Sequence, residues 1–436
     1  MEEQLPDIES GSLRKPYIST ILHALQDAQD VAVDMRDEEL AQNSELRRAI
    51  TIVEYFLRKT KRLCYGGMAI NAHLPTKLKF YDFRKTIPDY DFFSTTPEKD
   101  CEQLVQLLEK GKFENVSQRF GIHDGTYKIY VNYHGVADIT AMVPWLYNKL
   151  QKKSIHYDDI HYIDANFLRM SMYLELSRPR GEVERWDKVY KRLLLLNHVN
   201  PVGLHCKKGS SPLVTIQPDI YRKLLEYVIE SKFIFCGADL ANIYEKQKNK
   251  SSVMLKTNYP MVLYVKNCQY HLGKLRQIIM NADASAHIKI IHWEKTKDTV
   301  PEMYGIKINN NMSLLLLEEE YCFGYNTISV PKYGKLQIAS LDTAIALYYT
   351  LSYLRNLDEI VPNSIQCFAY DLVKISMKTR DKGAPSSFPP FIVNCQGHQP
   401  SKESLLKAKA IRIAKFKKTR KATKSLRRTM KVRTKA

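Results

Sequence analysis

Two aspartates separated by a single residue, inside an apolar stretch, constrain the fold of this chain most strongly. The stretch reads Ile87-Pro88-Asp89-Tyr90-Asp91-Phe92-Phe93. Side chains of a β-strand alternate between its faces, so Asp89 and Asp91 are predicted to share one face while Tyr90 and Phe92 enter a core. Carboxylates about 7 Å apart along a strand can converge on a divalent cation. Without a cation they repel each other, and the pKa of one of them rises.

A third carboxylate is predicted on a second strand. Residues 126–141 alternate apolar and polar side chains on both sides of His134-Gly135, which indicates a hairpin with a two-residue turn at that place. Asp138 faces opposite to Ala137 and Ile139. If its strand lies beside that of Asp89, three carboxylates meet and form a two-metal site. Such a site suits the in-line attack of a 3′-hydroxyl on an α-phosphate.

A glycine pair completes the predicted site. Gly66-Gly67 follows a short strand candidate and precedes a predicted helix over residues 68–73. Glycine lets the backbone approach a triphosphate closely, and a helix N-terminus offers unpaired N–H groups to phosphate oxygens. A glycine pair or a DxD alone is weak evidence. The order helix, strand, glycine pair, helix, DxD strand and Asp-bearing hairpin is much more specific.

Periodicity outside these motifs predicts the domain organisation. Residues 17–60, 164–176 and 182–196 have helical spacing, and a further helix begins at Thr96-Pro97-Glu98 and ends at Gly111. Turn-rich residues 200–212 are a candidate boundary. We therefore expect a helical N-terminal part (1–60), a catalytic domain (61–200), a mixed α/β domain (201–398) and a basic, flexible tail (399–436).

Positive charge is concentrated in that tail. The net charge is +19, and residues 401–436 hold fifteen Lys or Arg against one acid, so +14 of it lies there and only +5 in the rest. This distribution implies a polyanionic partner. Residues 405–436 contain no acid and almost no apolar periodicity, which is typical of disorder in isolation. An RNA tether and a nuclear-targeting signal are the two interpretations.

The cysteines and the apolar residues indicate the cellular compartment of the protein. Eight cysteines are scattered without a CxxC pair, so we expect reduced, buried thiols in an intracellular protein. His205-Cys206 is a fragment of a metal site at most. Without a run of about 18 apolar residues, no membrane-spanning segment is expected, and the acidic first residues predict no secretory signal.

At its motifs the chain resembles the polymerase-β-like nucleotidyltransferase superfamily. Within that superfamily it is similar to the poly(A) polymerase catalytic subunits of large nucleocytoplasmic DNA viruses. The resemblance is strongest over residues 45–200, looser over 200–360, and does not cover the last 36 residues. It is carried by Cys64-Tyr65-Gly66-Gly67-Met68-Ala69-Ile70-Asn71, by residues 87–94, by Val136-Ala137-Asp138, by Glu175-Leu176-Ser177-Arg178-Pro179 and by Arg185-Trp186.

The resemblance implies a fold, an activity and a site. It implies an α+β fold with a helical N-terminal part, a catalytic domain on a mixed sheet and a second mixed domain of nucleotidyltransferase-like shape. Phe235 to Leu240 echoes Tyr65 to Ala69 without a DxD after it, so the second domain is either a degenerate copy or an unrelated mixed domain. ATP is the implied donor and a single-stranded RNA 3′ end the acceptor. Asp89, Asp91 and Asp138 would bind two Mg²⁺ or Mn²⁺ ions and carry catalysis, and Gly66 and Gly67 would face the phosphates.

Partners, location and nucleotide contacts follow less directly. The resemblance implies a homodimer or a viral processivity partner, in the infected-cell cytoplasm and also the virion. Four residues are candidates for contacts to the nucleotide: Asn71, Arg169, Tyr173 and Lys188. A departure from the family pattern is Met68, where many members have a serine that contacts the triphosphate. The interval from Gly67 to Asp89 is also long, and in it basic residues alternate with aromatic ones. This pattern suits the binding of a single nucleic-acid strand; a solvated loop is the alternative.

Three functions remain open from the sequence. The first is template-independent polyadenylation by a polynucleotide adenylyltransferase. The second is another terminal nucleotidyltransferase, adding U or CCA. The third is a catalytically silent RNA-binding subunit, and the presence of all three carboxylates argues against it.

Overall fold

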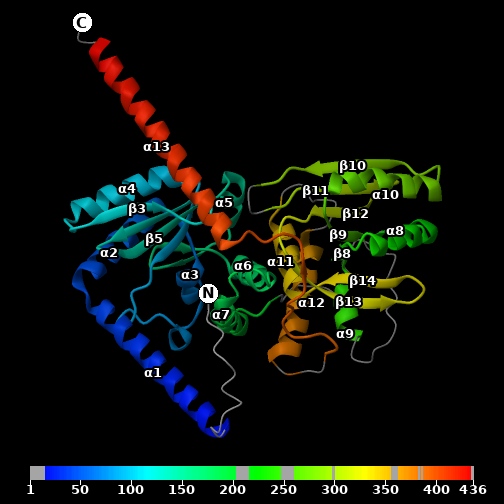
Figure 1. The fold of residues 1–436 in the computed structure, drawn as a ribbon, viewed down its shortest axis with the longest axis horizontal. Helices are drawn as coiled ribbons and strands as arrows, with labels where there is room; N and C mark the ends of the chain where they lie inside the picture. The colour runs from blue at the N-terminus through cyan, green and yellow to red at the C-terminus, as the bar shows by residue number, and fades with distance from the viewer. Residues whose placement is uncertain are drawn as a thin grey trace.

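Two α+β bodies lie side by side, and a long helix projects from the first body at each end of the described chain (Figure 1). The computed structural model describes residues 15–202, 216–246, 260–296, 300–354, 362–381, 383 and 386–433. Most of the predicted boundary and the pair His205-Cys206 therefore lie outside the described residues. Within the described residues no helix is long and apolar enough to span a membrane.

The first body is built on a seven-stranded mixed sheet of order β3-β4-β5-β2-β1-β7-β6. β2 runs parallel to β5 and antiparallel to β1, and β1 runs parallel to β7. The strands are β1 (Leu63–Tyr65), β2 (Tyr90–Ser94), β3 (Val116–Phe120), β4 (Thr126–Val131), β5 (His134–Ala141), β6 (Ile155–Tyr157) and β7 (Ile160–Tyr162).

Helices cover this sheet because their apolar stripes match it. The side chain of Asn43 accepts a hydrogen bond from the Leu46 N–H and so caps α2, whose Phe56 and Leu57 are buried beside Phe92 of β2. The helices of the first body are α1 (Lys15–Gln42), α2 (Ser44–Thr60), α3 (Gly66–His73), α4 (Pro97–Lys110), α5 (Pro144–Gln151), α6 (Ala165–Leu176) and α7 (Trp186–Val199), with 3₁₀ turns at Thr76–Leu78 and Val183–Arg185.

The hairpin turn lies two residues before the predicted place. Asn132 and Tyr133 form it, with φ of 47° and 70°, while His134 and Gly135 begin β5. The prediction of a turn at His134-Gly135 was wrong because local periodicity did not show which residues adopt positive φ. Asn132 tolerates that conformation, and its side chain accepts a hydrogen bond from the Asn115 N–H at 3.1 Å. Asp138 keeps its predicted face.

The second body repeats the topology of the first. Its sheet has the order β10-β11-β12-β9-β8-β14-β13-β15, and its strands pair with the same parallel and antiparallel directions as β3-β4-β5-β2-β1-β7-β6. The strands are β8 (Ile234–Phe235), β9 (Met261–Val265), β10 (Ile288–Trp293), β11 (Met303–Ile308), β12 (Asn311–Glu318), β13 (Phe323–Val330), β14 (Gly334–Ala339) and β15 (Cys395–Gln396). The topology favours the degenerate-copy interpretation over the unrelated domain.

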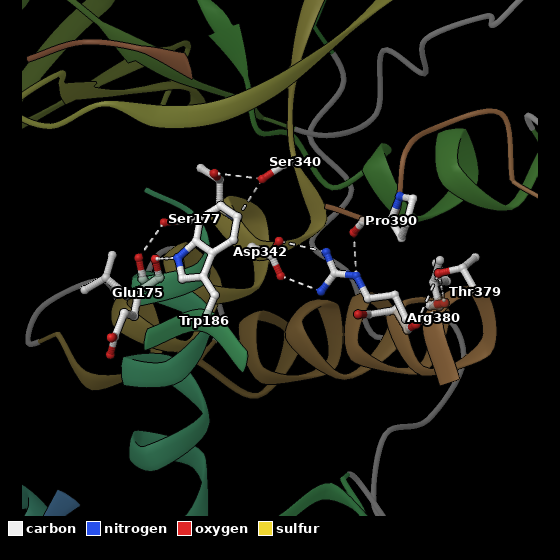
Figure 2. Close-up of polar contacts among 12 residues, drawn as sticks. Glu175, Ser177, Trp186, Ser340, Asp342, Thr379, Arg380 and Pro390 are labelled. Carbon is white, nitrogen blue, oxygen red and sulfur yellow. Dashed lines mark hydrogen bonds and ion pairs between the residues drawn. The ribbon is translucent and has the colours of Figure 1, made fainter. Parts of the chain in front are cut away.

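The two bodies meet through α6 and α11 (Leu341–Tyr353), and a polar cluster of the second body around Arg380 lies beside this contact (Figure 2). Arg380 lies between Asp342, with which it forms two hydrogen bonds of 2.7 Å, and the carbonyl oxygen of Pro390. The N–H of Gly324 donates to the Ser177 carbonyl oxygen at 2.9 Å. The helices of the second body are α8 (Pro218–Glu230), α9 (Leu240–Lys246), α10 (Cys268–Ala282), α11 (Leu341–Tyr353) and α12 (Pro362–Ser376), with a π-helical turn at Met377–Asp381.

One expectation about the cysteines was wrong. Cys322 and Cys395 form a disulfide, whereas Cys64, Cys101, Cys236 and Cys268 are buried free thiols as expected. Pairing of β15 with β13 brings the two Cα atoms to 5.3 Å, within the range that a disulfide needs. A sequence separation of 73 residues concealed this proximity.

The basic tail is a helix where a flexible segment was expected. α13 (Lys402–Arg433) is continuous over 32 residues. Lys, Arg, Ala, Leu and Met are good helix formers, so low hydrophobicity here does not exclude regular structure. Ser401 caps α13, because its hydroxyl oxygen accepts a hydrogen bond from the Ser404 N–H at 3.1 Å.

Candidate functional site

Strand register brings four polar side chains into one row across the first sheet. Asp91 of β2 lies opposite Asp138 of β5 on one side and Tyr65 of β1 on the other, and Asp138 lies opposite Lys128 of β4. Paired residues of neighbouring strands point to the same face. We refer to Tyr65, Asp91, Asp138 and Lys128 as the site row. Asp89 directly precedes β2.

The three predicted carboxylates converge. One oxygen each of Asp89, Asp91 and Asp138 lies within 4.8 Å of the others. Asp89 is exposed, while Asp91 and Asp138 are half-buried. Three carboxylates at such distances provide the hard oxygen ligands that Mg²⁺ and Mn²⁺ prefer, so the donor set fits divalent cations.

The electrostatics of the cluster also fit a cation. Burial, followed by the charges of Asp89 and Asp138, raises the pKa of Asp91 to about 8. Burial raises the pKa of Asp138 as well, although its ion pair with Lys128 acts in the opposite direction. Desolvation and like charges both disfavour ionised carboxylates, and a bound cation relieves both.

The glycine turn packs closely against Asp91 of this cluster. Gly66 has φ of +70°, and a Cβ added to it would lie 2.2 Å from Oδ2 of Asp91. A Cβ on Gly67 would lie 2.6 Å from the Tyr81 hydroxyl oxygen and 3.1 Å from Nη1 of Arg192. Gly66 is therefore favoured both by its positive φ and by this contact, whereas a side chain at Gly67 would have to displace the ends of the Tyr81 and Arg192 side chains. Met68, at the place of the family's serine, is buried in the core.

A cleft opens over the site row. Its volume is about 440 Å³, which lies within the range of about 300–1,000 Å³ for small-molecule sites. It therefore has room for a ligand of nucleotide size. Three of its lining residues are cations, which are Lys128, Arg185 and Arg192. Arg192 donates to the Tyr81 hydroxyl at 3.0 Å, and its guanidinium lies 4.6 Å from the centre of the Phe80 ring.

Three of the four candidate nucleotide contacts are buried structural residues. Asn71 accepts hydrogen bonds from the N–H groups of Phe80 and Tyr81, at 3.0 and 3.2 Å, and so fixes the segment that carries Tyr81 to the cleft. Arg169 is 2% exposed and bonds Asn197, Asn166 and the Asn200 carbonyl. Tyr173 is equally buried. The structure places neither Arg169 nor Tyr173 on the cleft lining.

The fourth candidate, Lys188, is an exposed residue of α7 and does not line the cleft. Partial burial and the charges of Arg192 and Arg185 lower the pKa of its ammonium, whereas Asp89 raises it. Sequence reasoning missed three cations of the cleft. The strand alternation that places Asp138 on the site face also places Lys128 there, so the sequence contained a signal for Lys128. Arg185 was part of a family motif without an assigned role, and no local signal points to Arg192.

The long interval after the glycine pair is partly tied down. Lys85 forms an ion pair with Glu38 at 2.9 Å, Arg84 pairs with Asp82, and Lys79 lies 4.2 Å from the centre of the Tyr157 ring. Tyr81 is the member of the interval that reaches the glycine turn. Through Tyr81 this segment contacts Arg192, which lines the cleft.

Known proteins resemble this chain in sequence. The sequence model of the family described as "Poly(A) polymerase catalytic subunit" matches residues 51–182. A protein of Acanthamoeba polyphaga mimivirus, named as a candidate poly(A) polymerase catalytic subunit, is 26% identical over 268 residues, which are 58% of this chain and 44% of that protein. A protein of African swine fever virus with the same name is 27% identical over 164 residues, 36% of this chain and 34% of that protein. The matched part thus spans less than half the length of either relative.

A solved structure extends the likeness in fold. The crystal structure of the Megavirus polyadenylate synthase matches with a TM-score of 0.70 at 18% identity, over 94% of this chain and 85% of that one. The match reaches both bodies, whereas the sequence model covers only the first. Residues 51–182, which contain the glycine turn and the three carboxylates, are thus the part that is similar in sequence to the poly(A) polymerase catalytic-subunit family, and the chain is similar in fold to a viral polyadenylate synthase.

Proposed function

We propose that this protein adds adenylates to RNA 3′ ends without a template, using ATP and releasing pyrophosphate. The observation that carries the proposal is the convergence of Asp89, Asp91 and Asp138 within 4.8 Å, beside a glycine turn where a Cβ on Gly66 would lie 2.2 Å from Asp91. The names of the viral relatives point to the same activity.

The roles of the residues follow from their positions. Asp89, Asp91 and Asp138 would hold two divalent cations, which in such sites activate a hydroxyl and stabilise the charge on the departing pyrophosphate. Gly66 and Gly67 begin α3, so the backbone N–H groups of this turn suit a phosphate. Arg185 and Arg192 supply positive charge to the lining of the same cleft. Together these groups bind, orient and electrostatically stabilise a triphosphate.

The alternative functions differ either in the nucleotide that is added or in whether the protein is catalytically active. Nothing in the site row selects adenine, so U or CCA addition is the closest competing activity. A silent subunit would have lost its carboxylates, as the second body has. There the row equivalent to Tyr65, Asp91 and Asp138 is Phe235, Leu263 and Leu316. The first body retains what the second has replaced, and this contrast supports catalysis in the first.

The test uses a labelled oligoribonucleotide with Mg²⁺ or Mn²⁺ and each nucleoside triphosphate in turn. ATP should give a ladder of extended products, and UTP, CTP and GTP should give little. Asp91→Asn should abolish extension while binding of the oligonucleotide persists. Asp219→Asn, which makes the same charge change at an exposed carboxylate of the second body, should have no effect. Extension by Asp91→Asn at the unsubstituted rate would reject the site, and a preference for another triphosphate would reject polyadenylation.

The proposed partners are also testable. A homodimer would appear as twice the chain mass of 50.6 kDa in light scattering. A viral processivity partner or a location in infected-cell cytoplasm and virion requires the protein in its source, and the resemblance is the basis for expecting both.

A further inference from the structure

The basic helix α13 is docked on the catalytic body, not suspended free of it. It begins between the two bodies and extends along the β3 side of the first sheet and beyond it (Figure 1). Arg412 donates to the Ile122 carbonyl oxygen at 2.8 Å and lies 3.4 Å from the Asp124 carboxylate. Phe416 packs edge-on against Phe120 of β3, with 5.3 Å between ring centres.

The docking face has helical spacing. The partly covered positions of α13 recur on one side, while the positions between them are exposed: Leu405, Lys409, Arg412, Ile413 and Phe416. The packing therefore uses the few apolar residues of a polar helix. It also uses one arginine, Arg412, as an anchor. These contacts attach the first turns of α13 to the sheet edge next to the cleft.

The same loop that anchors α13 forms a wall of the cleft. Ile122 and His123 line the cleft together with Asp91, Asp138 and Lys128. They also line an adjoining hollow whose other residues include Glu175, Arg185 and the beginning of α13 at Ser401, Lys402 and Leu405. The loop that contains Ile122 and His123 thus lies between the N-terminal end of α13 and the three carboxylates.

We propose that α13 is a guide rail for RNA: it binds the strand upstream of the 3′ end and leads that end past residues 121–125 into the catalytic cleft. The inference rests on the proposed function for the identity of the strand. Residues 401–436 carry a net +14, and a helix of 32 residues is about 48 Å long. A rigid rail of that charge attracts a polyanion without sequence preference.

The position of the rail makes RNA a better occupant than an import receptor. A targeting signal acts wherever it is attached, and nothing about it requires anchoring beside the carboxylates. A rail that holds the growing product keeps the released 3′ end at high local concentration next to the site, which favours repeated addition over dissociation. Phe416 and Arg412 hold the charged helix beside the cleft, which a free basic segment of the same charge would not achieve.

Two full-length variants separate charge from docking. The first replaces Lys417, Lys418, Lys421 and Lys424 by Gln, which removes four charges and keeps helix propensity. The second, Phe416→Ala, keeps every charge and loosens the packing on Phe120. The control replaces four exposed lysines of the second body by Gln: Lys274, Lys289, Lys332 and Lys335. RNA affinity is measured by fluorescence anisotropy of labelled oligo(A) at several salt concentrations, without ATP or divalent metal.

The four-Gln rail variant should weaken binding and reduce the salt slope by up to about 3, because each lysine that neutralises a phosphate of a single strand contributes about 0.7 to that slope. The control should leave the slope unchanged. Phe416→Ala should keep affinity within about two-fold but shorten several-fold the tracts made in one binding event, with a heparin trap present. Addition of a single adenylate at saturating primer should be unaffected in both rail variants.

A salt slope unchanged in the four-Gln rail variant would overturn the proposal and leave the targeting interpretation. Tracts of unaltered length from Phe416→Ala would overturn the guiding role. If the unsubstituted protein added no nucleotide, the proposed function would fail, while the binding measurements would still decide whether α13 holds RNA.

Discussion

The close approach of the glycine turn to Asp91 gives a quantitative prediction for Gly66→Ala. The new Cβ would lie 2.2 Å from Oδ2 of Asp91, whereas ordinary contact begins at 3.4 Å. Either the carboxylate or the turn must therefore move by roughly 1 Å, the difference between those distances. A misplacement of about 1 Å at a reacting centre costs about a hundred-fold in rate.

The same substitution has a separate cost in stability. At φ of +70° an alanine is disfavoured by roughly 1–2 kcal/mol relative to glycine. We expect Gly66→Ala to fold. Its free energy of unfolding, measured in urea, should be lower by that amount, and its rate of single-adenylate addition should fall by about two orders of magnitude. Its affinity for Mn²⁺, measured by calorimetry, should fall in parallel, because Asp91 is the displaced group.

Gly273→Ala is the matched control. It lies on an exposed part of α10, and an added Cβ meets nothing within 4 Å. It should raise stability by up to about 1 kcal/mol and leave activity unchanged. If Gly66→Ala extended RNA within two-fold of the unsubstituted rate, the argument that the turn and the carboxylate are in contact would be refuted.

Two further predictions concern pH and the buried ion pair of the second body. Because the pKa of Asp91 is raised to about 8 in the folded protein, against 3.8 for the free residue, the metal-free fold binds this proton more tightly than the unfolded chain does. The contribution of Asp91 to stability is therefore fully present below about pH 4 and is lost as the pH rises through about 8. Thermal melts of Asp91→Asn should show a smaller fall, and an equal fall would contradict the assignment. Asp342→Asn should cost about 3 kcal/mol in urea unfolding because it leaves the Arg380 charge buried without its counter-ion. Asp187→Asn, at an exposed pair with Lys191, should cost less than about 0.5 kcal/mol, and equal losses would reject burial as the cause.

The repeated topology shows that one arrangement of strands can carry either carboxylates or apolar side chains at corresponding positions. In the second body the row equivalent to Tyr65, Asp91, Asp138 and Lys128 is Phe235, Leu263, Leu316 and Tyr304. Leu263 and Leu316 are fully buried. Buried carboxylates without a cation are costly, so leucine at these positions favours a stable core over a site. The contrast shows that topology alone does not make a catalytic centre.

Local pattern was sufficient for several features of the first body. The period of two predicted which face Asp89, Asp91 and Asp138 occupy, because alternation is a property of any strand. The glycine pair before a helix predicted the turn, because glycine allows close approach and positive φ. The concentration of charge in the last residues predicted an attraction to polyanions, because charge is independent of fold.

Only the tertiary structure decided which of these groups meet. The alignment of Asp91 with Asp138 and of Asp138 with Lys128 depends on strand register, which is determined by packing across long sequence separations. Arg192 reaches the glycine turn because α7 packs beside α3, whereas Arg169, an equally plausible candidate in the sequence, faces the core. Faces are set by neighbours along the chain, but contacts are set by how helices and strands cross in space, and no local pattern encodes that.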